Sequence, residues 1–110
     1  MRIPNAEHAI IAPEKLRDYL LNPEHRRGAS KARFLLSLGY ARDRWQRLES
    51  DLRQQHLPQE VARVVQAEYG TRYEIHDPLI TPGRRIVMVR SIWQIDSGTN
   101  VPRLITMYPD

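Results

Sequence analysis

The sequence predicts an α+β protein in which N-terminal helices pack on a four-stranded antiparallel sheet. Apolar residues recur at helical spacing from about residue 13 to residue 56. From about residue 61 to residue 108, runs of β-branched and aromatic residues alternate with turn residues. Because the connections are short and no repeat is present, residues 1–110 are expected to form a single domain.

Three helices are predicted in the N-terminal half. Residues 13–21 begin with Pro13, which suits a first helical position. Residues 29–38 form the second helix and end at Gly39. Residues 42–56 form the third, and its apolar stripe consists of Trp45, Leu48, Leu52 and His56. Since the stripe ends in the last turn, the helix dipole there is expected to favour a protonated imidazole.

Two short strands follow. Segment 61–67 fits helical spacing as well as a strand, but its density of valine favours the strand. Residues 69–71 (Tyr-Gly-Thr) are typical of a hairpin turn, so residues 72–75 are expected to pair back. The loop that comes next is bracketed by Pro78 and Gly83.

The last two strands are predicted at residues 86–95 and 101–108, joined by a turn at 96–100. Side chains alternate between the two faces of a strand. On the first of these strands, the odd-numbered residues are the better core face because they include Trp93. Arg90 is then expected on the face away from the helices.

Arg90 and Arg103 interrupt the hydrophobic pattern of these strands. A guanidinium in a strand is costly unless it is paired or faces water, so either the sheet has one wet face or these arginines bind a ligand. Strict alternation separates Arg103 from Thr106, and the register decides which of them shares a face with Arg90. An ion pair with a neighbour such as Glu74 explains Arg103 equally well.

Composition excludes several classes of protein. There is no apolar run as long as a membrane span and no secretion signal, so a cytoplasmic protein without membrane association is expected. The lack of cysteine excludes disulfides and thiol catalysis. Neither a glycine-rich nucleotide loop nor a cluster of metal ligands is present, so no cofactor and no metal are expected.

The net charge of +4 is concentrated in residues 1–56, which hold eleven Lys and Arg against seven Asp and Glu. The densest basic cluster consists of Arg26, Arg27, Lys31 and Arg33. A polyanion such as RNA is therefore a reasonable partner, although a slightly basic surface is the simpler interpretation of charge alone. Lys31 falls inside an apolar helical arc. Either its stem covers the edge of the core, or its ammonium lies at the mouth of a pocket.

The remaining polar residues suit metal-independent cleavage of RNA by internal attack of the 2′-OH. This reaction needs a base, an acid and cations that stabilise charge on the phosphate. Arginine offers bidentate donors for phosphate oxygens. Thr106 or Tyr108 could add a hydroxyl donor.

Three segments resemble known proteins: N-P-E-H-R-R-G-A-S-K-A-R-F-L-L-S-L-G-Y (22–40), Y-G-T-R-Y (69–73), and R-S-I-W with P-R-L-I-T-M-Y-P (90–93 and 102–109). Together they resemble a bacterial family of small proteins with a domain of unknown function. The ending is also similar to that of the BECR toxins (barnase, EndoU, colicin and RelE-like). These are small α+β ribonucleases with helices before a four-stranded antiparallel sheet, often held by a neighbouring antitoxin.

This resemblance implies roles for the basic residues as general acid and base or as phosphate ligands. The candidate catalytic residues are His25, Lys31 and Arg90. The candidate substrate-binding residues are Arg103, Thr106, Arg26 and Arg27.

The leading hypothesis is a metal-independent endoribonuclease toxin of a toxin–antitoxin or effector–immunity pair, with RNA and a cognate antitoxin or immunity protein as partners. The alternative is a non-catalytic interaction module, antitoxin-like or adaptor, that binds an acidic protein. Simple RNA binding is a third hypothesis, but aromatic residues are scarce on the predicted wet faces. The enzymatic hypothesis requires the basic residues to converge on one surface.

Overall fold

The helices precede the strands along the chain, as the sequence predicts. The structure, a computed structural model, describes residues 1–110. Its elements are η1 (Ala6–His8), η2 (Lys15–Leu20), α1 (Ala29–Ser37), η3 (Arg42–Arg44), α2 (Trp45–Asp51), η4 (Leu52–His56), β1 (Arg63–Ala67), β2 (Gly70–Ile80), β3 (Ile86–Asp96) and β4 (Pro102–Pro109). The α+β class and the strand interpretation of 61–67 are confirmed.

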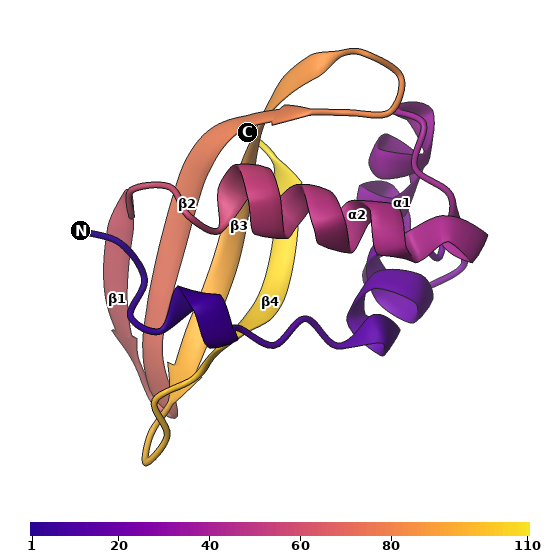
Figure 1. Cartoon of the computed structure of the whole chain (residues 1–110). Helices are drawn as coiled ribbons and strands as arrows, with labels where there is room; N and C mark the ends of the chain where they lie inside the picture. The colour runs from indigo at the N-terminus through magenta and orange to yellow at the C-terminus, as the bar shows by residue number, and fades with distance from the viewer.

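The four strands form one antiparallel sheet in the order β1-β2-β3-β4. In Figure 1, α2 and the turn after it cross one face of this sheet. Helix α1 lies beyond β4, and the β2–β3 connection reaches across the top of the molecule towards it. There the Gly83 N–H donates to the Leu38 carbonyl, at 2.9 Å.

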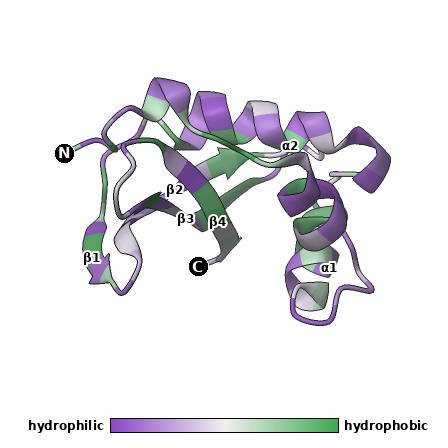
Figure 2. Ribbon diagram, turned by 90° about the horizontal axis from the view of Figure 1, so that it is seen from below, coloured by the Kyte–Doolittle hydropathy of each residue, from purple (hydrophilic) through white to green (hydrophobic).

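The predicted core face of β3 is confirmed, because Val89, Ser91 and Trp93 are fully buried. Figure 2 shows hydrophobic residues gathered in β2, β3 and β4 beneath α2. Arg90 lies on the other face, opposite His76 and Tyr108 on the neighbouring strands. That second face, which we call the wet face, therefore carries the arginines that interrupt the hydrophobic pattern.

His56 secures η4 to the core face of β3. Its Nδ1 accepts the Ser91 hydroxyl at 2.6 Å, and its Nε2 donates to the Asp77 carbonyl at 3.1 Å. The Trp93 indole donates to the same Ser91 oxygen at 2.8 Å. Burial lowers the pKa of His56, which is opposite to the shift expected from the helix dipole, so that expectation is wrong.

Pro78 lies inside β2 rather than in the predicted loop, and β2 is longer than the expected residues 72–75. Strand β1 pairs only with Gly70–Glu74, so β2 is an edge strand at Pro78 and the missing N–H leaves no ladder bond unmade. Proline is therefore a poor signal for the end of this strand.

A β-bulge in β4 changes which residues share a face. Thr106 lies opposite Ile92 and Arg103 opposite Gln94, with Ile105 as the extra residue. Both Arg103 and Thr106 consequently lie on the wet face with Arg90. The predicted separation of Arg103 from Thr106 is wrong, because strict alternation has no place for the extra residue.

Candidate active site

A groove of about 500 Å³ opens where η2 and the loop after it meet the wet face at β4. Seven residues line it: Glu14, Lys15, Tyr19, His25, Arg27, Ile105 and Thr106. We call it the Tyr19 groove. It brings residues of the N-terminal helical segment together with the last strand, which are far apart in the sequence.

The hydroxyl of Tyr19, one of the lining residues, lies between two polar side chains. Lys31 Nζ donates to Tyr19 Oη at 2.7 Å, and Tyr19 Oη lies 3.0 Å from Thr106 Oγ1. Because an ammonium only donates, the phenol accepts from Lys31, and either hydroxyl can be the donor in the Tyr19–Thr106 bond. When the phenol is the donor, the Thr106 hydroxyl proton is free for a ligand in the groove.

Two ammonium groups flank the Tyr19 ring, with Lys15 Nζ 5.2 Å and Lys31 Nζ 5.3 Å from its centroid. Burial alone would raise the pKa of the Tyr19 phenol. The hydrogen bonds with Lys31 and Thr106 and the positive charges of Lys31 and Lys15 together outweigh burial, so this pKa lies below its usual value. Partial burial lowers the pKa of Lys15, and the nearby charges of Arg103 and Lys31 lower it further, although Tyr19 acts in the opposite direction.

His25 packs edge-on against the Tyr19 ring, with centroids 4.9 Å apart and planes at 72°. Its Nδ1 accepts the backbone N–H groups of Arg27 and Gly28, each at 3.0 Å. In the neutral ring the proton therefore lies on Nε2, so His25 offers a donor rather than an acceptor. A Cβ at Gly28 would lie 2.7 Å from the Tyr19 ring, so only glycine allows this close approach.

The backbone of η2 helps to explain why Tyr19 lies at the edge of the core. Leu16 and Leu20 are fully buried, whereas Tyr19 is half-buried. The Leu21 N–H donates to the Leu16 carbonyl at 2.8 Å, which closes a wide π-type turn. Residues 13–20 are helical, one residue short of the predicted range 13–21, but this turn is not apparent from the apolar spacing.

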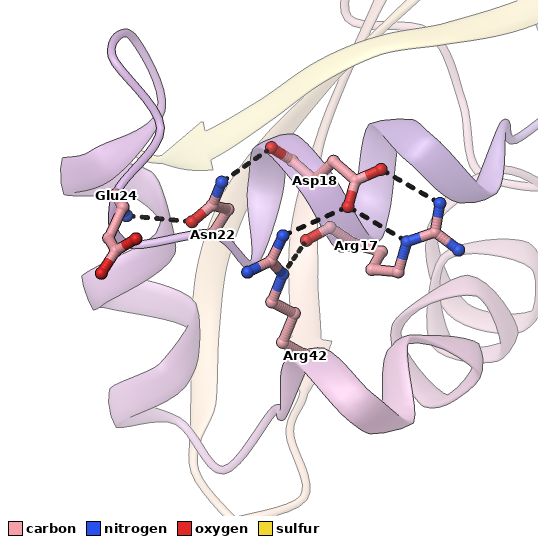
Figure 3. A network of polar contacts seen from close by, with 5 residues as sticks. All are labelled: Arg17, Asp18, Asn22, Glu24 and Arg42. Carbon is pink, nitrogen blue, oxygen red and sulfur yellow. Dashed lines mark hydrogen bonds and ion pairs between the residues drawn. The ribbon is translucent and has the colours of Figure 1, made fainter.

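A polar network holds η2 against η3 and fixes the start of the His25 loop (Figure 3). The Asp18 carboxylate accepts both Arg17, at 3.0 Å, and Arg42, at 3.2 Å. Asn22 donates to the Asp18 carbonyl at 3.2 Å and accepts the Glu24 N–H at 3.0 Å. The residues on both sides of Tyr19 are therefore anchored in the Figure 3 network.

Arg90 belongs to a different cluster, farther along the wet face. Its guanidinium lies 3.4 Å from Glu74 and 3.2 Å from Asp110, and the same Asp110 carboxylate contacts His76. We call these four residues the Arg90 cluster. Here the Arg90 guanidinium has two carboxylate partners.

Arg103 is also neutralised by a carboxylate. Its Nε and Nη2 donate to the two Asp96 oxygens at 2.8 and 3.1 Å. The partner is Asp96 rather than the expected Glu74. This bidentate pair ties the end of β3 to the start of β4.

The predicted site residues thus separate into two groups. His25, Arg27 and Thr106 line the Tyr19 groove, and Lys31 reaches it through Tyr19. Arg26 is exposed on the same loop. Arg90 and Arg103 lie outside this lining in ion pairs.

Sequence reasoning missed Glu14, Lys15 and Tyr19. Tyr19 shares helical spacing with Leu16 and Leu20, and such spacing is ordinarily interpreted as core. The available signal was the pair Lys15 and Tyr19 in a short helix next to a basic loop. That signal could not be interpreted without the fold, because the partner of Tyr19, Thr106, lies 87 residues away in the sequence.

No group of three or more His, Asp and Glu side chains lies together in a way that could hold a metal ion. No helix of the structure combines the length and the apolar character needed to cross a membrane.

Comparison with known proteins identifies a family and a shared fold. Residues 2–110 match the family described as Domain of unknown function (DUF6883). None of the curated proteins matches the chain. A solved chain from a contact-dependent growth inhibition toxin–immunity protein complex of Klebsiella pneumoniae 342 superposes with a TM-score of 0.67. The superposition covers 92% of this chain and 99% of that chain at 14% identity, which is a likeness of fold.

Proposed function

We propose that this chain, which belongs to the DUF6883 family, is the toxin of a bacterial toxin–immunity or toxin–antitoxin pair and acts as a metal-independent endoribonuclease. The Tyr19 hydroxyl, held between Lys31 and Thr106 in a groove lined with cations, is the observation that carries this proposal. The fold shared with a chain of a growth-inhibition toxin–immunity complex supports the partner class.

The groove suits a phosphodiester because its cations lack carboxylate partners. Lys15 and Arg27 line it without an ion pair, and Lys31 donates to the uncharged phenol. Such charges favour binding of a phosphate and of the additional negative charge that develops on it during reaction. In this proposal they take the place of a metal ion.

The base in this mechanism is Glu14. It contributes the one carboxylate of the groove lining. His25 cannot take this role, because its acceptor nitrogen, Nδ1, already accepts two backbone N–H groups. Glu14 accepts the 2′-OH proton as O2′ attacks the adjacent phosphorus. A new O2′–P bond forms, the P–O5′ bond breaks, and a 2′,3′-cyclic phosphate results.

The acid is the chain of donors that ends in Thr106. The Thr106 hydroxyl gives its proton to the leaving O5′, Tyr19 resupplies Thr106, and Lys31 resupplies Tyr19. The depressed pKa of Tyr19 favours this transfer, since it makes the phenol a better acid. His25 contributes its Nε2–H as a hydrogen-bond donor to the phosphate. Arg90 and Arg103 have structural roles in this proposal.

Expression in bacteria without a partner tests the proposal. Wild type is expected to arrest growth and to produce RNA fragments with 2′,3′-cyclic phosphate ends. Tyr19→Phe should abolish both effects, whereas Arg33→Gln, which removes an exposed charge outside the groove lining, should retain them. A harmless wild type, or a Tyr19→Phe protein that folds and remains equally toxic, would contradict the proposal.

A non-catalytic interaction module remains the second candidate, because one observation favours a protein partner. Ile80, Ile86 and Met88 form an exposed apolar group near the β2–β3 connection. Co-purification with a neighbour-encoded protein, together with complete absence of RNA cleavage, would select this function over the enzymatic one.

A further inference from the structure

A second groove, of about 340 Å³, crosses the wet face of the sheet beside the Tyr19 groove. Its lining consists of Arg63, Val65, Arg72, Glu74, Ile92, Ile105, Thr106 and Tyr108. We call it the sheet groove. It shares Ile105 and Thr106 with the Tyr19 groove, so a ligand can extend from one into the other.

Arg72 differs from the other arginines in the middle of the wet face, because its partner is uncharged. Its Nε donates to Gln94 Oε1 at 2.8 Å, and Gln94 is held in turn by Asp96 at 2.6 Å. This bond orients the guanidinium and leaves both Nη groups available. A fixed guanidinium with free Nη donors is suited to a phosphate.

The one carboxylate of the sheet groove is already compensated. Glu74 lies 3.4 Å from Arg90 and 3.7 Å from Arg63. Its charge therefore does not neutralise Arg72, and the groove keeps a positive potential.

The rest of the lining suits an unpaired nucleobase. Ile92 and Val65 provide apolar surface, and Tyr108 provides an aromatic ring on which a base can stack. Adjacent strands of a sheet lie about 4.8 Å apart, so β4 and β2 are roughly 10 Å apart. This distance exceeds the length of a single phosphate group, so a ligand that spans the groove needs more than a phosphate. A base can reach this surface only if it is not stacked within a duplex.

We propose that the sheet groove is a second nucleotide subsite, in which Arg72 binds a phosphate and Tyr108 stacks a base, so that the protein takes single-stranded RNA. This inference rests on the proposed ribonuclease function. It assigns the scissile phosphate to the Tyr19 groove and a neighbouring nucleotide to the sheet groove. Arg72 is thus a binding residue and not a catalytic one.

Binding of uncleavable 2′-O-methyl oligonucleotides to the full chain tests the subsite, with fluorescence anisotropy at fixed salt as the measurement. A single-stranded hexanucleotide is expected to bind more tightly than either a dinucleotide or a duplex. Arg72→Gln should weaken hexanucleotide binding roughly tenfold, the usual effect of losing a charge-assisted contact. It should change dinucleotide binding much less. Arg33→Gln is the matched loss of charge outside both grooves.

Two results would overturn the subsite: equal effects of Arg72→Gln and Arg33→Gln on the hexanucleotide, or equal affinity for the duplex and the single strand. Tyr108→Ala provides a second variant, and thermal unfolding verifies that each variant is folded. If wild type cleaves RNA while Arg72→Gln matches it in affinity and rate, the subsite fails and the ribonuclease stands. If wild type neither binds nor cleaves any RNA, both proposals fail.

Discussion

The Tyr19 groove and the Arg90 cluster lie on the same face of one sheet, and both contain basic side chains, yet their charges are arranged differently. In the Arg90 cluster, carboxylates of Glu74 and Asp110 lie within 3.4 Å of the guanidinium. In the Tyr19 groove, the ammonium of Lys31 instead donates to a phenol.

This difference indicates which region is built for a ligand. A guanidinium paired with two carboxylates has little charge left for a phosphate, and its bonds tie strands together. Cations beside an uncharged phenol are not neutralised by a neighbouring carboxylate. Their partial burial costs free energy, and binding of an anion can offset that cost. Arg90 first drew attention because it is a basic residue within a strand. Whether a basic residue binds a ligand is indicated better by its interaction partners than by its position in a strand.

The largest expected effect comes from removing the Tyr19 hydroxyl. Tyr19→Phe keeps the ring that packs against His25 but breaks the donor chain from Lys31 to Thr106. We expect the rate of RNA cleavage to fall by at least about 100-fold, as is typical for loss of a general acid. Single-turnover cleavage by the purified protein measures this, and an unchanged rate would remove Tyr19 from the mechanism.

Replacement of Lys31 is expected to have the next largest effect. Lys31→Met keeps the stem of the side chain and removes the donor to the phenol, so the cleavage rate should fall roughly tenfold or more. The pKa of Tyr19 should rise, because the hydrogen bond from Lys31 lowers it in the wild type. Tyrosinate absorbance during alkaline titration, with Tyr19→Phe subtracted as the reference, measures that pKa. An unchanged Tyr19 pKa in Lys31→Met would show that Lys31 does not lower the pKa of the phenol.

Acid should destabilise the sheet that carries both regions, because His56 joins η4 to strands β2 and β3. Burial lowers the pKa of His56 in the folded protein, so the unfolded chain binds the proton more readily. Its contribution to the free energy of unfolding is complete above about pH 6.5 and decreases as the pH falls, by up to about 1.4 kcal/mol per pH unit. Urea unfolding at several pH values measures this slope.

The matched control for this pH dependence is His8→Gln, which alters an exposed histidine and should leave the slope unchanged. His56→Asn should lower stability at neutral pH and reduce the slope below pH 6.5. A slope that persists in His56→Asn would assign the dependence to another group.

The smallest effect on catalysis is expected for Arg90. Arg90→Gln removes the ion pairs with Glu74 and Asp110 and should lower the midpoint of thermal unfolding. Cleavage should remain at the wild-type rate, because Arg90 is not part of the groove lining. A large loss of cleavage without loss of stability would show that the Arg90 cluster takes part in the reaction.

Much of the fold follows from periodicity in the sequence. Alternation in β3 correctly places Trp93 in the core and Arg90 on the wet face, because an uninterrupted strand has a strict period of two. The same rule fails in β4, where one extra residue brings Arg103 and Thr106 to the same face. A bulge leaves no consistent mark in residue composition.

The site was only partly predictable. His25, Arg27, Lys31 and Thr106 could be proposed as chemically suitable residues, and the structure places all four at or beside one groove. Tyr19 could not, because an aromatic residue on an apolar helical stripe ordinarily belongs to the core. Its position at the edge of the core beside Thr106 depends on a π-type turn and on contact with a strand at the other end of the chain.

RNA cleavage by purified Tyr19→Phe and Arg90→Gln, measured side by side with wild type, tests the central claim most directly. The claim is that cations without carboxylate partners mark the reactive site, whereas those in ion pairs hold the sheet together. It predicts that wild type and Arg90→Gln cleave RNA at the same rate and that Tyr19→Phe is nearly inactive. A Tyr19→Phe protein that cleaves like wild type while Arg90→Gln is inactive would contradict it.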